Sequence, residues 1–126
     1  MQLDQPRSLN EAEKQILGAL LEPEFPGVVE LRTQVPHTMV VGRCDCGCPT
    51  VDLAVSNDVS RSSVKVRARL APVEAQIAPV KDEPPGEIIL FVDDGRLSSL
   101  EYVFYVDSPP SRWPSLDRLT VVVRTD

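Results

Sequence analysis

The chain begins with two segments whose apolar residues recur at helical spacing. In the first segment the apolar stripe consists of Leu9, Ile16, Leu17, Leu20 and Leu21. Ser8 and Glu11 precede most of this stripe and fit a capping box, in which a hydroxyl and a carboxylate satisfy the first backbone N–H groups. Pro23 ends the helix because proline lacks a backbone donor. A second, shorter helix is expected between Pro26 and Pro36, with Pro26 as its first helical residue.

From His37 onward the helical period gives way to the alternation that is typical of β-strands. The apolar face of a first hairpin is predicted to place His37, Met39 and Val41 opposite Val55, Leu53 and Val51, respectively. Asp45-Cys46-Gly47 is the expected three-residue loop, because glycine adopts the left-handed conformation that such a loop requires. This loop keeps the apolar residues of the two strands opposite one another.

The rest of the chain alternates between short apolar runs and turn residues. Further strands are predicted over residues 64–70, 73–77, 88–92, 97–106 and 119–123. The strand over 64–70 is expected to have a basic outer face and to be interrupted by Pro72, and the strand over 119–123 is expected at a sheet edge. Asp94-Gly95 predicts a second hairpin. Two helices followed by these strands indicate an α+β fold, with both helices packed on a mainly antiparallel sheet of five to six strands built from hairpins.

Length and charge narrow the class of protein. The 126 residues fit one domain, 1–126, with residues 1–7 and 124–126 expected to be flexible. The formal net charge is −6, which disfavours binding to nucleic acid and favours a basic partner if there is one. The first apolar run is too short for a signal peptide or a membrane span, and no membrane association is expected. We therefore expect a cytoplasmic protein.

The most unusual chemistry is the segment that contains Cys44, Cys46 and Cys48. Three thiolates on one tight loop can bind Zn²⁺ or a softer metal, although a structural zinc site normally has four ligands. His37 is a poor fourth ligand, because it is predicted on the opposite strand face and roughly 20 Å away. Asp45 or a residue from elsewhere is then needed. Two alternatives stay open: thiol redox chemistry between Cys44 and Cys48, and a purely structural role as small buried residues.

The remaining candidate residues have ordinary structural explanations beside functional ones. An interaction surface could be formed by Arg61, Lys65, Arg67 and Arg69 on their strand, and by Trp113 as a docking residue. The same basic residues can simply form a solvated strand face, and Trp113 can instead cover the core. Asp52, Glu101 and His37 would be the residues of an enzyme cleft. No glycine-rich phosphate loop, zinc-protease helix or serine nucleophile motif occurs in the sequence, which favours a protein that is not an enzyme.

Two motifs resemble a known group of proteins. These motifs are Gly42-Arg43-Cys44-Asp45-Cys46-Gly47-Cys48-Pro49-Thr50-Val51-Asp52-Leu53 and Asp94-Gly95-Arg96-Leu97-Ser98-Ser99-Leu100-Glu101. Both are similar to signatures of small uncharacterised actinobacterial proteins, and Glu24-Phe25-Pro26-Gly27 also fits that group. The resemblance implies a source and a cytoplasmic compartment but no site. A further analogy, at the level of fold and size, is with immunity or partner proteins of toxin systems.

These observations favour a cytoplasmic protein that binds a partner without catalysis, through a sheet face, the cysteine hairpin or both. A protein partner is preferred over a small ligand. The alternative is a metal-binding or thiol-redox protein centred on Cys44, Cys46 and Cys48, for which Zn²⁺ is the possible cofactor.

Overall fold

The computed structural model describes residues 1–124, which form two helices, two short 3₁₀ turns and seven strands. The helices are α1 (Glu11–Leu20) and α2 (Val28–Gln34), and the 3₁₀ turns are η1 (Val35–His37) and η2 (Leu116–Arg118). The strands are β1 (Gln2–Ser8), β2 (Thr38–Arg43), β3 (Val51–Val55), β4 (Leu70–Ile77), β5 (Gly86–Asp93), β6 (Arg96–Phe104) and β7 (Leu119–Val123). They form one antiparallel sheet in the order β1-β2-β3-β6-β5-β4-β7. The α+β class is confirmed, but the predicted number of strands is too low.

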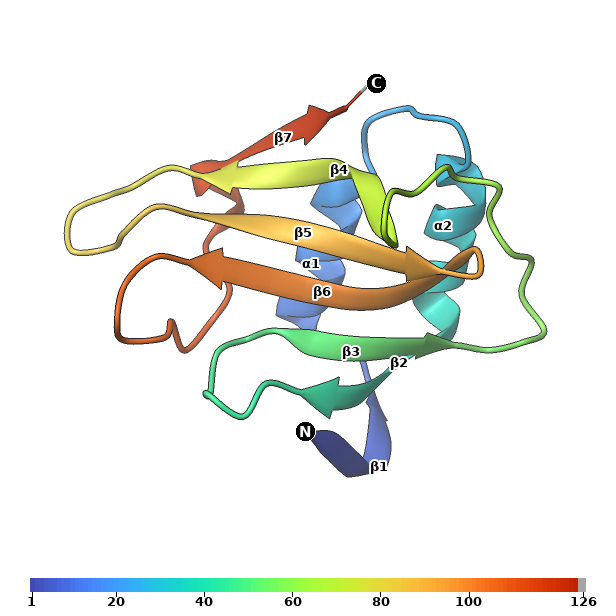
Figure 1. Ribbon diagram of the computed structural model, residues 1–126, viewed down its shortest axis with the longest axis horizontal. Coiled ribbons are helices and arrows are strands. Elements are labelled where there is room, and N and C mark those ends of the chain that lie inside the picture. The colour runs from blue at the N-terminus through green and yellow to red at the C-terminus, as the bar shows by residue number, and fades with distance from the viewer. Residues whose placement is uncertain (125–126) are drawn as a thin grey trace.

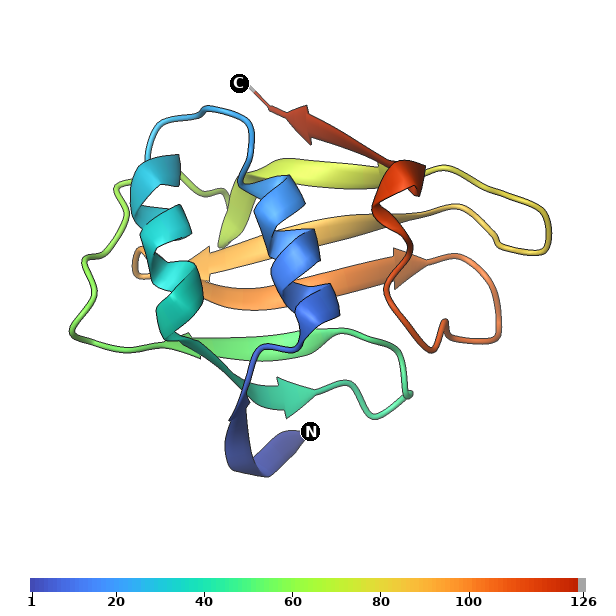
Figure 2. The same cartoon turned by 180° about the vertical axis from the view of Figure 1, so that it is seen from behind.

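Both helices cover the same face of the sheet. Figure 1 views the sheet from its uncovered side with the helices behind it, and Figure 2 shows the helices in front. The inner face of α1 is fully buried at Ile16, Leu17 and Leu20, and it packs on sheet residues such as Ile88 and Leu90. The predicted packing of both helices on one sheet face is therefore confirmed, and no element within residues 1–124 covers the other face.

The N-terminus of α1 is capped two residues later than the sequence pattern predicts. The capping box uses Asn10 and Glu13 in place of Ser8 and Glu11. The Asn10 side chain accepts a hydrogen bond from the Glu13 N–H at 2.8 Å, and the Glu13 carboxylate accepts one from the Asn10 N–H at 2.8 Å. Arg7 also binds the buried Glu13 carboxylate with two nitrogens, at 3.0 and 2.9 Å. Because Ser8 belongs to β1, the helix cannot begin there.

Replacing Asn10 with alanine is expected to lower the free energy of unfolding by about 1 kcal/mol, because the Glu13 N–H loses its side-chain acceptor. Urea unfolding of the Asn10→Ala variant measures this change. Asn10→Ser is the matched control, since serine also caps helices well, and it should keep most of the stability. Equal losses in the two variants would contradict this role of the side chain.

Residues 56–69, here called the basic loop, do not form the predicted strand over 64–70. The loop packs on the start of α2 and on the β5–β6 turn. The Ser62 hydroxyl donates to the Gly27 carbonyl at 2.6 Å, and the Ser62 N–H donates to the Gly95 carbonyl at 2.7 Å. Gly27 has φ 92°, and a Cβ there would lie 2.5 Å from the backbone nitrogen of Val64. The alternation of apolar and polar residues in this segment therefore comes from the packing of Val64 against the start of α2. The segment does not pair as a strand of the sheet.

Pro72 lies inside β4 and does not interrupt it. The pairing of β4 with β5 shifts register between Leu70 and Glu74, so the proline sits at an irregularity of the ladder. At such a position the missing backbone N–H is tolerated. The strand β4 therefore runs through Pro72 and contains the predicted strand over 73–77, whereas only Leu70 of the predicted strand over 64–70 belongs to it.

The β2–β3 hairpin pairs one residue out of the predicted register. Val40 lies opposite Leu53, the position predicted for Met39, and a β-bulge at Val41 shifts the pairing again. As a result Val40 is fully buried while Met39 is 38% exposed. A shift of one residue exchanges the two faces of a strand. The sequence is ambiguous here because the adjacent residues Val40 and Val41 are compatible with either register. His37, predicted in this strand, belongs to η1.

The two ends of the chain also differ from expectation, whereas other elements agree with it. Residues 1–7, expected to be flexible, mostly belong to β1, which pairs with β2. At the other end Arg124 donates its N–H to the Pro72 carbonyl at 2.7 Å, and residues 125–126 lie outside the described part of the chain. The Asp94-Gly95 turn is confirmed, with φ 53° and 74°. The edge position of β7 is confirmed as well.

Candidate metal centre

The three cysteines lie on the loop that joins β2 to β3. The Cys44 N–H donates to the Thr50 carbonyl at 3.2 Å, so the loop comprises residues 45–49 and is longer than predicted. Cys44 therefore does not face Cys48 across the hairpin. Gly47 has φ 91° and donates its N–H to the Cys44 carbonyl at 3.4 Å, which confirms its expected left-handed conformation. The turn at Gly47 curls the loop so that all three thiols point toward one another.

The three sulfur atoms form one compact group. All three Sγ atoms lie within 4.8 Å of one another, and those of Cys44 and Cys46 are 3.0 Å apart. Tetrahedral thiolate ligands of Zn²⁺ lie about 3.8 Å apart, because each Zn–S bond is about 2.3 Å long. The group therefore needs only small side-chain movements to surround a metal ion. Cys46 is exposed, Cys44 is half-buried and Cys48 is buried, so an ion would enter from the Cys46 side.

The surroundings of the thiols shift the pKa values of Cys46 and Cys48 in opposite directions. Hydrogen bonding with the Cys44 thiol, and then with the Cys48 thiol, raises the pKa of Cys46 to about 11. Burial acts to raise the pKa of Cys48, but hydrogen bonds from Thr50 and from the neighbouring thiols outweigh it and lower that pKa. Cys48 thus becomes a thiolate more readily than Cys46, which holds its proton at neutral pH. The contribution of Thr50 was not predicted, because it depends on the observed hairpin register.

No fourth side-chain ligand completes the group among residues 1–124. The Asp45 carboxylate lies 3.5 Å from the Met1 nitrogen and does not belong to the sulfur group. Met1 also donates to the Arg43 carbonyl at 2.6 Å, which ties β1 to the base of the loop. Together Met1, Arg43 and the loop line a small hollow of about 210 Å³. His37 is exposed outside this hollow, so its expected exclusion from the site agrees with the structure.

The residues of the predicted interaction surface do not come together. Arg61, Lys65, Arg67 and Arg69 are exposed in the basic loop. Arg61 forms an ion pair with Asp94 at 3.0 Å, beside the β5–β6 turn. Trp113 lies beyond the other end of β6 and is only 8% exposed, with its ring stacked on Tyr102 at 5.8 Å. Trp113 therefore covers the core at one end of the sheet, and the basic side chains lie at the other.

The three residues of the conceivable enzyme cleft are not assembled into one. Asp52 pairs with Ser99 of β6, which puts Asp52 and Glu101 on the same uncovered sheet face. His37 ends η1 next to the start of β2, and none of the three residues lines the hollow at the cysteine loop or the larger groove beside α1. Asp52 and Glu101 thus share a sheet face, whereas His37 belongs to η1.

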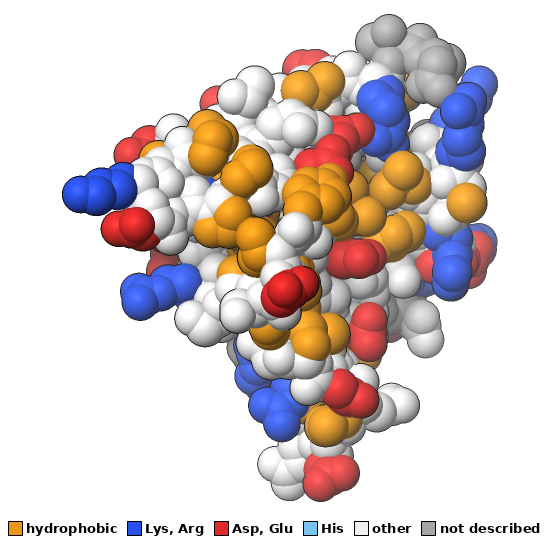
Figure 3. Space-filling model, turned by 60° about the vertical axis from the view of Figure 1, so that its left-hand side comes forward, with side chains coloured by type: hydrophobic (Ala, Val, Ile, Leu, Met, Phe, Trp, Pro, Cys, Tyr) orange, Lys and Arg blue, Asp and Glu red, His pale blue; other side chains and the backbone are white. Residues whose placement is uncertain are grey.

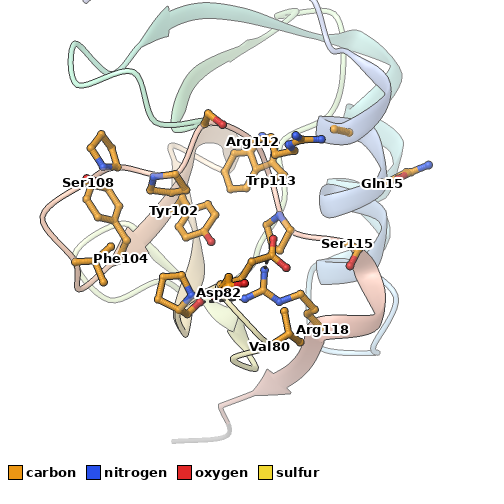
Figure 4. A pocket seen from close by; sticks show the side chains of 18 residues that line it. Gln15, Val80, Asp82, Tyr102, Phe104, Ser108, Arg112, Trp113, Ser115 and Arg118 are labelled. Carbon is orange, nitrogen blue, oxygen red and sulfur yellow. Dashed lines mark hydrogen bonds and ion pairs between the residues drawn. The ribbon is translucent and has the colours of Figure 1, made fainter.

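A larger groove opens between α1, residues 80–84 and residues 106–115, with a volume of about 1180 Å³. Figure 3 shows hydrophobic side chains gathered beside carboxylates at this end of the molecule, and Figure 4 looks into the groove. Arg118 donates to the carbonyls of Ala78 and Pro84, each at 3.0 Å, and its guanidinium lies 3.6 Å from the Glu83 carboxylate. Arg118 is therefore engaged in holding the loop over residues 78–84. The lining residues include no histidine or cysteine.

Comparison of the chain with protein families, with curated proteins and with solved structures finds no match in any of the three. None of the helices formed by residues 1–124 is long and apolar enough to span a membrane.

Proposed function

We propose that the protein is a non-enzymatic binding protein whose ligand at the cysteine loop is a thiophilic metal ion, Zn²⁺ or a softer cation. The observation that carries this proposal is the mutual approach of Cys44, Cys46 and Cys48, whose sulfur atoms all lie within 4.8 Å of one another. Thiolate sulfur is the ligand that favours Zn²⁺ and Cu(I) over hard cations such as Mg²⁺. Three protein ligands leave a fourth position of Zn²⁺ to water or to a partner.

The loop supports the bound state in two ways. The Cys48 N–H lies 3.4 Å from the Cys46 sulfur, and such an N–H stabilises the negative charge of a thiolate. The loop is also held at its base by the Cys44–Thr50 hydrogen bond and by β1. Because the sulfur atoms are already close, binding requires little ordering of the chain. In a reducing cytoplasm, which we propose as the compartment, the thiols stay available for metal.

Addition of Zn²⁺ to the reduced, metal-free protein is expected to show about one bound ion per chain and to release protons. Cys46 carries its proton at neutral pH, because its pKa is about 11, and it must lose that proton to bind the ion. The affinity for Zn²⁺ should therefore rise from about pH 6 to about pH 8. Calorimetry in buffers of different ionisation enthalpy measures both quantities. Co²⁺ is the spectroscopic control, since thiolate ligands produce a sulfur-to-cobalt absorption band. A chain that shows no such band and takes up no Zn²⁺ contradicts the proposal.

The rival at the same loop is thiol redox chemistry, which the 3.0 Å separation of the Cys44 and Cys46 sulfurs favours. A protein that binds no metal but readily forms a Cys44–Cys46 disulfide under mild oxidation would support this rival. Mass spectrometry of the alkylated protein distinguishes the two outcomes, because metal binding protects all three thiols from alkylation and a disulfide protects two.

A further inference from the structure

The face of the sheet opposite the helices carries no covering layer in the described chain (Figure 1). The strand register places its side chains in rows. One row runs Val122, Glu74, Ile89 and Glu101, and the next runs Thr120, Gln76, Glu87 and Val103. A third row runs Phe91, Ser99 and Asp52. We call these residues the open face.

The open face alternates apolar and acidic side chains. Three apolar side chains of this face are half-buried, namely those of Ile89, Phe91 and Val103. The side chain of Val122 is 41% exposed. An apolar strip of this kind on central strands differs from the polar outer face that a solvated antiparallel sheet usually presents. The surface is therefore suited to contact with another molecule.

The charges of the open face are mostly uncompensated. Glu74 pairs with Arg124, but Asp52, Glu87 and Glu101 make no ion pair with any residue of the described chain. Glu87 accepts hydrogen bonds from the hydroxyl of Tyr105 and from Gln76, which lower its pKa and keep it ionised. The face thus presents, around an apolar strip, three carboxylates that have no ion-pair partner in the described chain.

This charge pattern decides among the possible occupants. A second copy of the chain would place like carboxylates against one another, and nucleic acid or an anionic membrane would be repelled. We propose that the open face docks a basic amphipathic segment of a protein partner, in which apolar side chains cover Ile89 and Val103 while Lys or Arg side chains pair with Asp52, Glu87 and Glu101. The net charge of −6 steers such a segment toward the protein.

The test uses a fluorescent helical peptide of leucine and lysine as the probe, and the same peptide with glutamate in place of lysine as its control. Fluorescence anisotropy is measured on the full chain in a chelator, so that metal binding plays no part. The lysine peptide should bind, more weakly as salt is raised, and the glutamate peptide should not. Failure of both peptides to bind would overturn the docking proposal while leaving the metal site untouched.

Two double variants of equal charge separate docking from general attraction. Asp52→Asn with Glu101→Gln removes two carboxylates from the open face, and Glu22→Gln with Asp58→Asn removes two exposed carboxylates elsewhere. The first pair should weaken binding by at least about threefold and the second by clearly less, because close charge pairs outweigh screened distant ones. Val103→Thr, which keeps the strand-forming shape, should also weaken binding. Equal losses in the two double variants would overturn the proposal.

Discussion

Replacing Cys46 with serine is expected to weaken Zn²⁺ binding by at least about 100-fold, because a protein ligand of structural zinc contributes on the order of 3 kcal/mol. Cys46 is the best position for this test. Its side chain is exposed, so the substitution removes the sulfur without disturbing the core. Competition with a chelating dye measures the dissociation constant, and thermal unfolding of the metal-free variant should match that of the unchanged protein.

Asp45→Asn is the matched control for the metal site. Asp45 is the neighbouring exposed residue of the same loop, but its carboxylate does not belong to the sulfur group. The affinity for Zn²⁺ should therefore change little. If Asp45→Asn weakens binding as much as Cys46→Ser does, the carboxylate is a ligand and the three-sulfur description is wrong. If neither substitution changes the affinity, Cys46 is not a ligand and Zn²⁺ binds elsewhere on the chain.

Replacing Gln34 with alanine is expected to lower the free energy of unfolding by about 3 kcal/mol. Gln34 is fully buried at the end of α2. Its amide nitrogen donates to the carbonyls of Ser60 and Gly95 at 3.0 and 2.8 Å, and its amide oxygen accepts from the Leu97 N–H at 3.0 Å. One side chain thus joins α2 to the basic loop and to the β5–β6 hairpin. Alanine would leave the buried Leu97 N–H without this acceptor and would remove the bond to the Ser60 carbonyl, whereas the Gly95 carbonyl keeps its bond from the Ser62 N–H.

Equilibrium unfolding in urea measures this loss, and hydrogen exchange locates it. The Leu97 N–H should exchange faster in the Gln34→Ala protein, because it loses its acceptor. Thr33→Ala is the control on the same helix, since Thr33 is exposed and its hydroxyl only bonds the Val29 carbonyl. It should change stability by no more than about 0.5 kcal/mol. Similar losses in both variants would mean that the helix, and not the amide network, is responsible.

Sequence patterns were sufficient to predict the elements whose conformation depends on residues close to one another along the chain. The apolar stripe of α1, the Asp94-Gly95 turn and the edge strand β7 all agree with prediction, as does the left-handed conformation of Gly47. Each of these depends on helical periodicity, on turn conformation or on a short β-branched run. Such preferences are set by neighbouring residues along the chain.

Several predictions that needed contacts between distant segments were wrong, although the packing of both helices on one sheet face was predicted correctly. β1 is polar in sequence and is ordered by pairing with β2. Val64 alternates like a strand residue, yet it packs beside Gly27 in the basic loop. Either Val40 or Val41 can face the core in an alternating strand pattern. The sequence therefore did not determine the register of β2. Only the completed sheet and its helices select among these alternatives.

In the cysteine loop, too, some features could be predicted from the sequence and others depended on contacts between distant segments. The spacing of Cys44, Cys46 and Cys48 was enough to place three thiols on one turn, because residues two apart cannot separate far on a short loop. The tertiary structure decided their chemistry. The β2–β3 register placed Thr50 where it lowers the pKa of Cys48, and sheet order put β1 beside the loop. The sequence alone thus determined which atoms are available, and long-range pairing, which depends on the whole sheet, determined their surroundings.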